Sequence, residues 1–155
     1  MIKYEQRVAS TITGMIGACP EADDIGQETF IRFYKSLNSF RGDSSLLTYL
    51  TRIAINLSLN ELKRRKRRNF FVPVSIQEVK NHINMADSAE KTEIQDMVQK
   101  ALTKLQPKFK TVIILRLIDG FSTKETADIL RLPEGTVLSR LSRAQKKLKE
   151  ILGPI

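Results

Sequence analysis

The sequence predicts an all-α protein that consists of two small helical domains joined by a linker. Apolar residues recur at three- and four-residue steps through most of the 155 residues, which is the period of an amphipathic helix. The one β-like stretch, FFVPVSI, is interrupted by Pro73 and has no evident partner strand. An acidic stretch without a sustained helical period separates two basic blocks. We therefore place the domains at residues 1–70 and 92–155, with the linker at 71–91.

The charge of the chain predicts a polyanionic partner. The formal net charge is +9 and the sequence pI is about 9.8. Residues 41–70 carry eight basic and two acidic side chains, and residues 131–155 carry six and two. Concentrated positive charge of this kind favours binding to nucleic acid, although it does not determine the fold.

Cysteine content and hydropathy indicate a cytoplasmic protein. Cys19 is the single cysteine, so no disulfide can form within the chain, and we expect it to pack as a small apolar residue. No run approaches 18 apolar residues, and charges interrupt the first ten residues. We expect neither a signal peptide nor direct membrane insertion. His82 lies in the linker without a partner motif, so it predicts no metal site.

Three helices are predicted in the first domain. The first is short, and about 20 residues precede the second, so we expect this domain to be the less stable of the two. The second helix lies in DIGQETFIRFYKSLNSF, and the third follows the break RGDSS. The residues expected to be buried are Val8, Ile12, Met15 and Ile16 in the first helix, Ile25, Phe30, Phe33, Tyr34 and Leu37 in the second, and Leu46, Leu47, Leu50, Ile53, Ala54 and Leu57 in the third.

The second domain is predicted to begin with two helices. Ile94, Met97, Val98, Ala101, Leu102 and Leu105 follow the helical period in the first of them. Pro107 suits the first turn of the next helix, PKFKTVIILRLI, which Asp119-Gly120 would end. Its expected buried side consists of Phe109, Val112, Ile113 and Leu117.

The last two helices have the layout of a helix-turn-helix. Ser122 and Glu125 have the spacing of a capping box, a helix of about two turns follows, and Pro133 suits the start of the next helix. A solvated amphipathic helix is the plainer alternative, but the paired helices argue against it. The residues expected to read DNA in a major groove are Thr136, Ser139, Arg140, Arg143 and Lys147, and the backbone at Gly135-Thr136 could accept a phosphate.

An acidic cluster near residue 24 could be interpreted as a metal site, because carboxylates at i and i+4 can bind a divalent cation. This cluster comprises Glu21, Asp23, Asp24 and Glu28. No histidine lies nearby and no second acidic cluster completes a two-metal site, so we predict no metal, no cofactor, no catalytic residue and no small-molecule substrate.

Three motifs resemble the sigma-70 family of bacterial transcription initiation factors, specifically its extracytoplasmic-function (ECF) group. The family's D-x-x-Q-E-x-F motif is matched by Asp24, Gln27, Glu28 and Phe30. Its T-[WY]-L-x-R-I-A-x-N motif is matched from Thr48 to Asn56, and its P-E-G-T-V-x-S-R-L-x-R-A motif from Pro133 to Ala144. The resemblance covers about residues 20–69 and 95–152.

The resemblance implies three contact surfaces. The acidic helix would dock on core RNA polymerase through Asp24, Gln27, Glu28, Phe30 and Ile31. The RGDSS loop and the following helix would melt and read the minus-10 promoter element through Arg41, Ser44, Ser45, Tyr49, Arg52, Asn56 and Lys63. The helix-turn-helix would read the minus-35 element, and an anti-sigma factor is a further candidate partner.

Aromatic side chains beside the RGDSS loop carry two interpretations. Phe40 and Tyr49 could stack on unpaired bases, or they could pack in the core, which we prefer for Phe40. The six consecutive cations of Lys63 to Arg68 could follow a nucleic-acid backbone or form a solvated helix end.

The chain departs from the family pattern at three positions. Arg131 stands where the turn often has glycine, Leu138 where a basic residue is common, and Asn60 where aspartate is frequent. The alternative functions are a helix-turn-helix regulator that binds DNA without polymerase, and a DNA-processing enzyme, for which catalytic residues are lacking.

Overall fold

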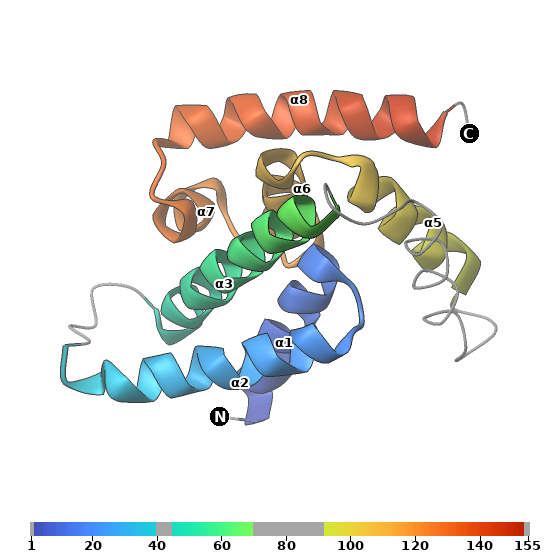
Figure 1. The fold of residues 1–155 in the computed structure, drawn as a ribbon. Helices are drawn as coiled ribbons and strands as arrows, with labels where there is room; N and C mark the ends of the chain where they lie inside the picture. Colours follow the sequence, from blue (N-terminus) through green and yellow to red (C-terminus); the bar gives the residue numbers. More distant parts are fainter. Residues whose placement is uncertain (1, 40–44, 70–91, 154–155) are drawn as a thin grey trace.

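The computed structural model describes residues 2–39, 45–69 and 92–153, and every regular element in these ranges is helical, as predicted (Figure 1). The first half holds three α-helices and one short 3₁₀ turn, and the second holds four α-helices and one π-helical turn. The elements are α1 (Ile2–Ile16), α2 (Pro20–Lys35), η1 (Leu37–Ser39), α3 (Leu46–Asn69), α5 (Thr92–Lys104), α6 (Pro107–Ile113), η2 (Ile114–Ile118), α7 (Thr123–Leu130) and α8 (Glu134–Leu152).

The first half is a three-helix unit in which α3 packs against both α1 and α2. Helix α1 buries the four apolar residues that its spacing predicts, and Ile12 and Met15 are fully inaccessible to solvent. Helix α2 begins at Pro20, a residue that suits a first turn because it has no N–H to leave unpaired there. Leu50, Ala54 and Ile55 of α3 complete this part of the core.

The second half forms the predicted helix-turn-helix from α7 and α8. Ser122 Oγ accepts a hydrogen bond from the Glu125 N–H, and the Glu125 carboxylate accepts one from the Ser122 N–H, both at 3.0 Å. This capping box satisfies two backbone donors at the start of α7. Arg131 ends α7 in the left-handed region, at φ 55° and ψ 49°, the conformation that favours glycine at this position.

The two halves share their main apolar core, and a smaller cluster of Val112, Ala127 and Val137 lies within the second half. Buried residues of α1 and α3 cluster with residues of α6 and η2, including Phe109 and Ile114. Gly14 allows α1 to approach closely, since a Cβ atom there would lie 3.3 Å from Ile114 Cδ1. The sequence predicts two domains, but it does not predict that they pack directly on each other.

Polar contacts reinforce this contact between the halves. Lys110 Nζ donates to the Met15 carbonyl oxygen at 2.9 Å, and burial, with a smaller effect of nearby Arg65, lowers the pKa of Lys110 to about 8. Thr11 Oγ1 donates to Asp119 Oδ2 at 2.6 Å. Burial raises the pKa of Asp119, although the Thr11 hydrogen bond and the Arg7 charge oppose that rise. The contact between the halves therefore includes two groups with shifted pKa values, Lys110 and Asp119, so its stability should depend on pH.

Three residues expected to be buried are exposed instead. Tyr34 is 73% exposed, Leu37 45% and Leu117 51%. Helical periodicity identifies the apolar side of a helix, but it does not show how much of that side other elements cover. The predicted linker, together with Phe40, Pro73 and His82, lies outside the described residues.

Candidate nucleic-acid interface

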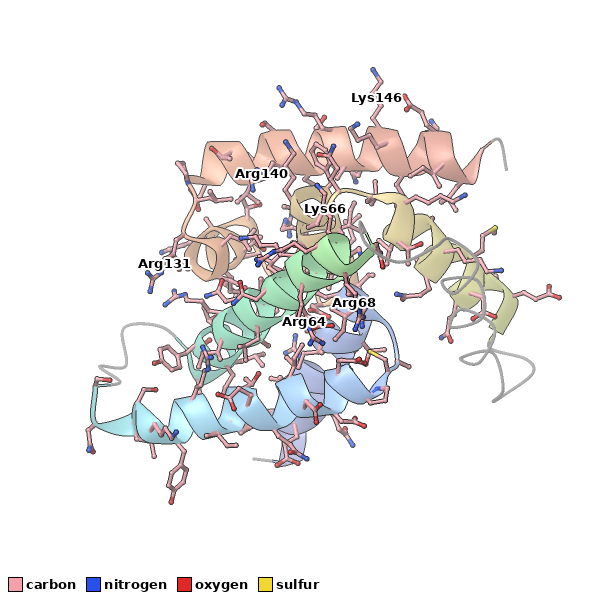
Figure 2. All side chains as sticks on the ribbon, in the orientation of Figure 1. Arg64, Lys66, Arg68, Arg131, Arg140 and Lys146 are labelled. Carbon is pink, nitrogen blue, oxygen red and sulfur yellow. The ribbon has the colours of Figure 1, made fainter. Side chains whose placement is uncertain are left out.

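Helix α8 presents a polar, basic face to solvent. At about 100° per residue, Leu138, Ser142, Ser139 and Arg143 lie about 100°, 140°, 200° and 240° around the axis from the buried Val137. All four are exposed, as is Lys146, which points away from the body of the molecule in Figure 2. We call these five residues the outer face of α8. It offers hydroxyl donors and acceptors beside cations, the chemistry that base edges and phosphates require.

The predicted minus-35 residues fall only partly on this outer face. Ser139 and Arg143 belong to it, and Thr136 is partly buried in the first turn. Arg140 is half-buried and lies on the side of α8 that faces the rest of the molecule (Figure 2). The ammonium of Lys147 lies over the ring of the buried Phe109, 5.4 Å from its centroid. Arg140 and Lys147 therefore flank the outer face.

Sequence reasoning missed three residues of the outer face, namely Leu138, Ser142 and Lys146. The family pattern marks Leu138 only as a position where a basic residue is common, and no motif points to Ser142 or Lys146. The angular position of each follows from its distance to Val137 and Ala144 along the chain. The buried residues of α8 could therefore have identified all three.

Helix α3 carries most of the predicted minus-10 residues on one stripe. Tyr49, Arg52, Asn56 and Lys63 lie within about 60° of one another around the axis, by the same geometry. Ser45, which precedes the helix, continues this stripe, and its Oγ accepts a hydrogen bond from the Thr48 N–H at 3.1 Å. Ser45 therefore caps the helix as well. Asn56 and Lys63 are exposed. Arg41 and Ser44 lie outside the described residues.

Part of the α3 stripe lies against the other half of the chain. Helices α3 and α7 are in contact, and Arg52 Nη2 donates to the Asp128 carbonyl oxygen at 2.7 Å. Arg52 Nε is buried and has no hydrogen-bond partner among the described residues. The guanidinium is thus held by α7, but incompletely satisfied there.

Tyr49 is built into the contact between α2 and α3. Its hydroxyl donates to Ser36 Oγ at 2.9 Å, and Ser36 Oγ donates to the Phe33 carbonyl oxygen at 3.0 Å. Its ring meets the Phe33 ring edge to face, with centroids 5.9 Å apart. These contacts give Tyr49 a packing role, while its stacking on a base remains a prediction.

The basic end of α3 is not a uniform row of free cations. The buried Glu61 pairs with Arg64 at 2.9 Å and with Arg65 at 3.2 Å. Arg65 also donates to the Ile16 carbonyl oxygen at 2.7 Å and to Cys19 Sγ at 3.1 Å. Cys19 thus has a polar partner, not only the apolar packing expected. Lys63, Lys66, Arg67 and Arg68 remain exposed at this end.

Helix α2 carries four of the five predicted polymerase contacts on the side away from the core, whereas Phe30 packs against the core. Asp24, Gln27 and Ile31 are exposed, whereas Glu28 and Phe30 are partly buried. Glu28 pairs with Arg32 at 3.0 Å. The exposed Tyr34 extends the same stripe by nearly one turn, because residues three apart are neighbours on a helix. We call Asp24, Gln27, Glu28, Ile31 and Tyr34 the α2 face.

The acidic cluster does not assemble a metal site. Within residues 2–39, 45–69 and 92–153, no group of three or more histidine, cysteine, aspartate or glutamate side chains could hold a metal ion. A hydrogen bond to its own backbone is the largest effect lowering the pKa of Glu21. Its neighbours Arg65 and Arg68 contribute further. The negative charge of Glu21 therefore stabilises the N-terminus of α2, where a carboxylate is favoured by the helix dipole.

Family comparisons match both halves of the chain. The family model described as sigma-70 region 2 matches residues 1–68, and the one described as sigma-70, region 4 matches residues 95–148. RNA polymerase sigma-H factor of Pseudomonas aeruginosa is 32% identical over all of this chain and 85% of its own length. ECF RNA polymerase sigma factor SigW of Bacillus subtilis is 31% identical over 96% of this chain and 84% of its own.

The chain belongs to the sigma-70 family, in its ECF group. It is a sigma factor that binds core RNA polymerase and directs initiation at promoters, and it is not an enzyme. The sigma factor RpoE of Bartonella quintana has a TM-score of 0.74 and 25% identity, covering 97% of this chain and 92% of that one. The sigma factor CnrH has a TM-score of 0.70 over 97% of this chain and 83% of that one.

Proposed function

We propose that the α2 face docks on core RNA polymerase, that the α3 stripe reads the minus-10 element, and that the outer face of α8 reads the minus-35 element. Exposed Ile31 and Tyr34 beside carboxylates suit a protein partner, whereas the hydroxyls and cations of α8 suit DNA. The factor would act in the cytoplasm. None of the described helices has the length and apolar run that a bilayer crossing needs.

The packed arrangement is too small to read both promoter elements at once. The elements are centred about 25 base pairs apart, or about 85 Å at about 3.4 Å per base pair. A compact chain of 155 residues has a radius of gyration of about 15 Å and is about 40 Å across. Residues 70–91 can span up to about 75 Å when extended, so their length permits the halves to separate.

We infer that the packed form is a resting state that opens during initiation. The hydrogen bond from Arg52 to the Asp128 carbonyl carries this proposal, because it ties a predicted minus-10 residue to the minus-35 half. Arg52 Nε has no partner among the described residues, so DNA can offer this guanidinium more hydrogen bonds than α7 does.

An anti-sigma factor is the proposed partner of the packed form. RpoE of Bartonella quintana was solved in complex with the anti-sigma factor NepR, and CnrH with the cytosolic domain of CnrY. Their similarity to this chain extends over nearly its whole length, across both halves. A partner that holds the halves together would keep the two DNA-reading surfaces from reaching their elements.

Runoff transcription with core polymerase tests the α2 assignment. Changing both Asp24 and Gln27 to alanine should weaken association with core polymerase and lower promoter-dependent transcript. Lys149→Ala, an exposed change on α8, is the control for polymerase binding. Full polymerase affinity in the double variant would reject the α2 assignment. Binding to promoter DNA without any support of transcription would favour a polymerase-independent regulator.

The contact between the halves can be tested at Gly14. A Cβ atom at Gly14 would lie 3.3–3.6 Å from three atoms of Ile114, which belongs to the other half. Gly14→Phe should therefore force α1 and η2 apart and destabilise the packed form by about 1–3 kcal/mol. Ser10→Phe adds the same ring to an exposed position of the same helix. We expect a larger scattering radius and more transcript at limiting polymerase for Gly14→Phe alone, with helical circular dichroism unchanged. A compact, unaltered Gly14→Phe protein would contradict the proposal.

A further inference from the structure

Leu138 is an exposed apolar residue on a helix face that is otherwise polar. It is the fifth residue of α8 and is 53% exposed. Within the described residues of α8 it is the sole large hydrophobic side chain with that degree of exposure. The core of the helix-turn-helix therefore does not account for it.

The neighbours of Leu138 indicate which partner it meets. Ser142 lies one turn after it, Ser139 is adjacent in sequence, and Arg143 and Lys146 complete the outer face. Because serine is much shorter than leucine, the Leu138 side chain projects beyond both hydroxyls. A protein-docking patch would bring several apolar residues together, as Ile31, Tyr34 and Leu37 do in and just beyond α2. A single apolar group among hydroxyls and cations fits the major groove of DNA instead.

One group on the floor of the major groove is apolar, the C5-methyl group of thymine. The first turns of a recognition helix reach the base edges, and Leu138 lies in this part of α8. We propose that Leu138 reads a thymine of the minus-35 element through this methyl group. A basic residue at the same position would contact a phosphate or a guanine, so Leu138 would give this factor a promoter preference of its own. The inference rests on the proposed role of the outer face of α8.

Replacing thymine by deoxyuridine tests the contact on the DNA side. The replacement removes only the C5-methyl group and leaves the O4 acceptor and the base pairing in place. The holoenzyme, formed from the full chain and core polymerase, is first used to select its minus-35 sequence from a random pool. Each thymine of the selected element, on either strand, is then replaced in turn, and holoenzyme affinity is measured.

We expect one replacement to weaken binding of the wild-type holoenzyme by about fourfold, the effect of returning one methyl group to water. Leu138→Ala should bind the thymine and deoxyuridine promoters equally. The control Lys149→Ala, an exposed change on α8 that is not one of the five residues of the outer face, should keep the fourfold difference. Leu138→Arg should move the preference at this position toward guanine, which arginine contacts through O6 and N7.

The proposal fails if no replacement affects the wild type, if the selected element contains no thymine on either strand, or if Leu138→Ala keeps the difference. It also fails if Leu138→Arg still prefers thymine. Loss of the minus-35 role itself would look different, because the wild-type holoenzyme would then select no minus-35 sequence at all. A Leu138→Ala defect in binding an anti-sigma factor, with thymine discrimination intact, would assign Leu138 to a protein contact and overturn the inference.

Discussion

The two helices assigned to DNA differ in how much of their reading surface is free. The outer face of α8 is exposed along its length, on the side of the molecule opposite α2 (Figure 1). The α3 stripe begins under the contact with α7, where Arg52 already bonds to a backbone carbonyl. The packed chain therefore leaves the proposed minus-35 surface free and covers part of the proposed minus-10 surface. In this account the arrangement of the halves regulates one reading helix and leaves the other available.

Among the predicted changes, substitution of Arg143 on the outer face of α8 should have the largest effect on promoter affinity. Arg143→Ala should reduce holoenzyme affinity for the promoter by about 1–3 kcal/mol if Arg143 contacts a base, and the loss should depend on the minus-35 sequence. Arg140→Ala should have a smaller effect, because Arg140 is half-buried and flanks the outer face. Competition binding on native and scrambled minus-35 DNA measures both. An equal loss on scrambled DNA would show that Arg143 contacts only phosphate.

Lys110 should make the stability of the packed form depend on pH. Its folded pKa of about 8 lies below the usual 10.5, so the unfolded chain binds more protons between these values. The free energy of unfolding should thus rise with pH across this window, by about 1–3 kcal/mol in total. Urea denaturation at pH 7, 8, 9 and 10 measures this rise.

Lys110→Met should remove that dependence, whereas Lys108→Met, an exposed neighbour on the same helix, should keep it. The same pH dependence in the wild type and in Lys110→Met would mean that the pKa of Lys110 does not differ between the packed form and the unfolded chain.

A Tyr49→Phe variant tests the packing role of Tyr49 on α3 separately from base stacking. Tyr49→Phe keeps the ring and removes the hydroxyl that donates to Ser36, so it should cost about 1 kcal/mol of stability. If Tyr49 also stacks on a base, the variant should still form permanganate-reactive open complex, because phenylalanine can stack as well. Unchanged stability in a denaturant titration would show that the bond to Ser36 contributes nothing.

Arg131 should give the smallest effect and the opposite sign. A non-glycine residue in the left-handed region costs about 1 kcal/mol, so Arg131→Gly should raise the midpoint of thermal unfolding slightly. Arg131→Ala keeps the strain and serves as the control for the loss of charge. A destabilised glycine variant would indicate that the arginine side chain makes compensating contacts.

Local rules predicted the helices and failed at the contacts between them. The capping box and Pro107 at a helix start each depend on a few neighbouring residues, and the structure confirms both. The contact of Lys110 with Met15 joins residues 95 positions apart, and a lysine is ordinarily expected at the surface. No local pattern indicates that this lysine is buried between two halves.

The candidate surfaces were predictable to the extent that helix geometry fixes them. The α2 face and the α3 stripe follow from residue spacing once the buried side of each helix is known. The same spacing cannot show that α7 lies beside Arg52, because that depends on how the halves pack. Tyr34 was assigned to the core for a related reason, since an apolar residue at the edge of a helix face can belong to either side.

Distance between the halves is the quantity that tests the central claim most directly. Spin labels at Lys35→Cys and Lys149→Cys, both exposed, would mark α2 and α8 in a Cys19→Ser background. Double electron–electron resonance should give a narrow distribution at a short distance in the free chain. In the promoter complex with polymerase, the distance between the labels should be tens of ångströms longer. The same short distance in that complex, or a broad distribution in the free chain, would contradict a packed resting state that opens to read the promoter.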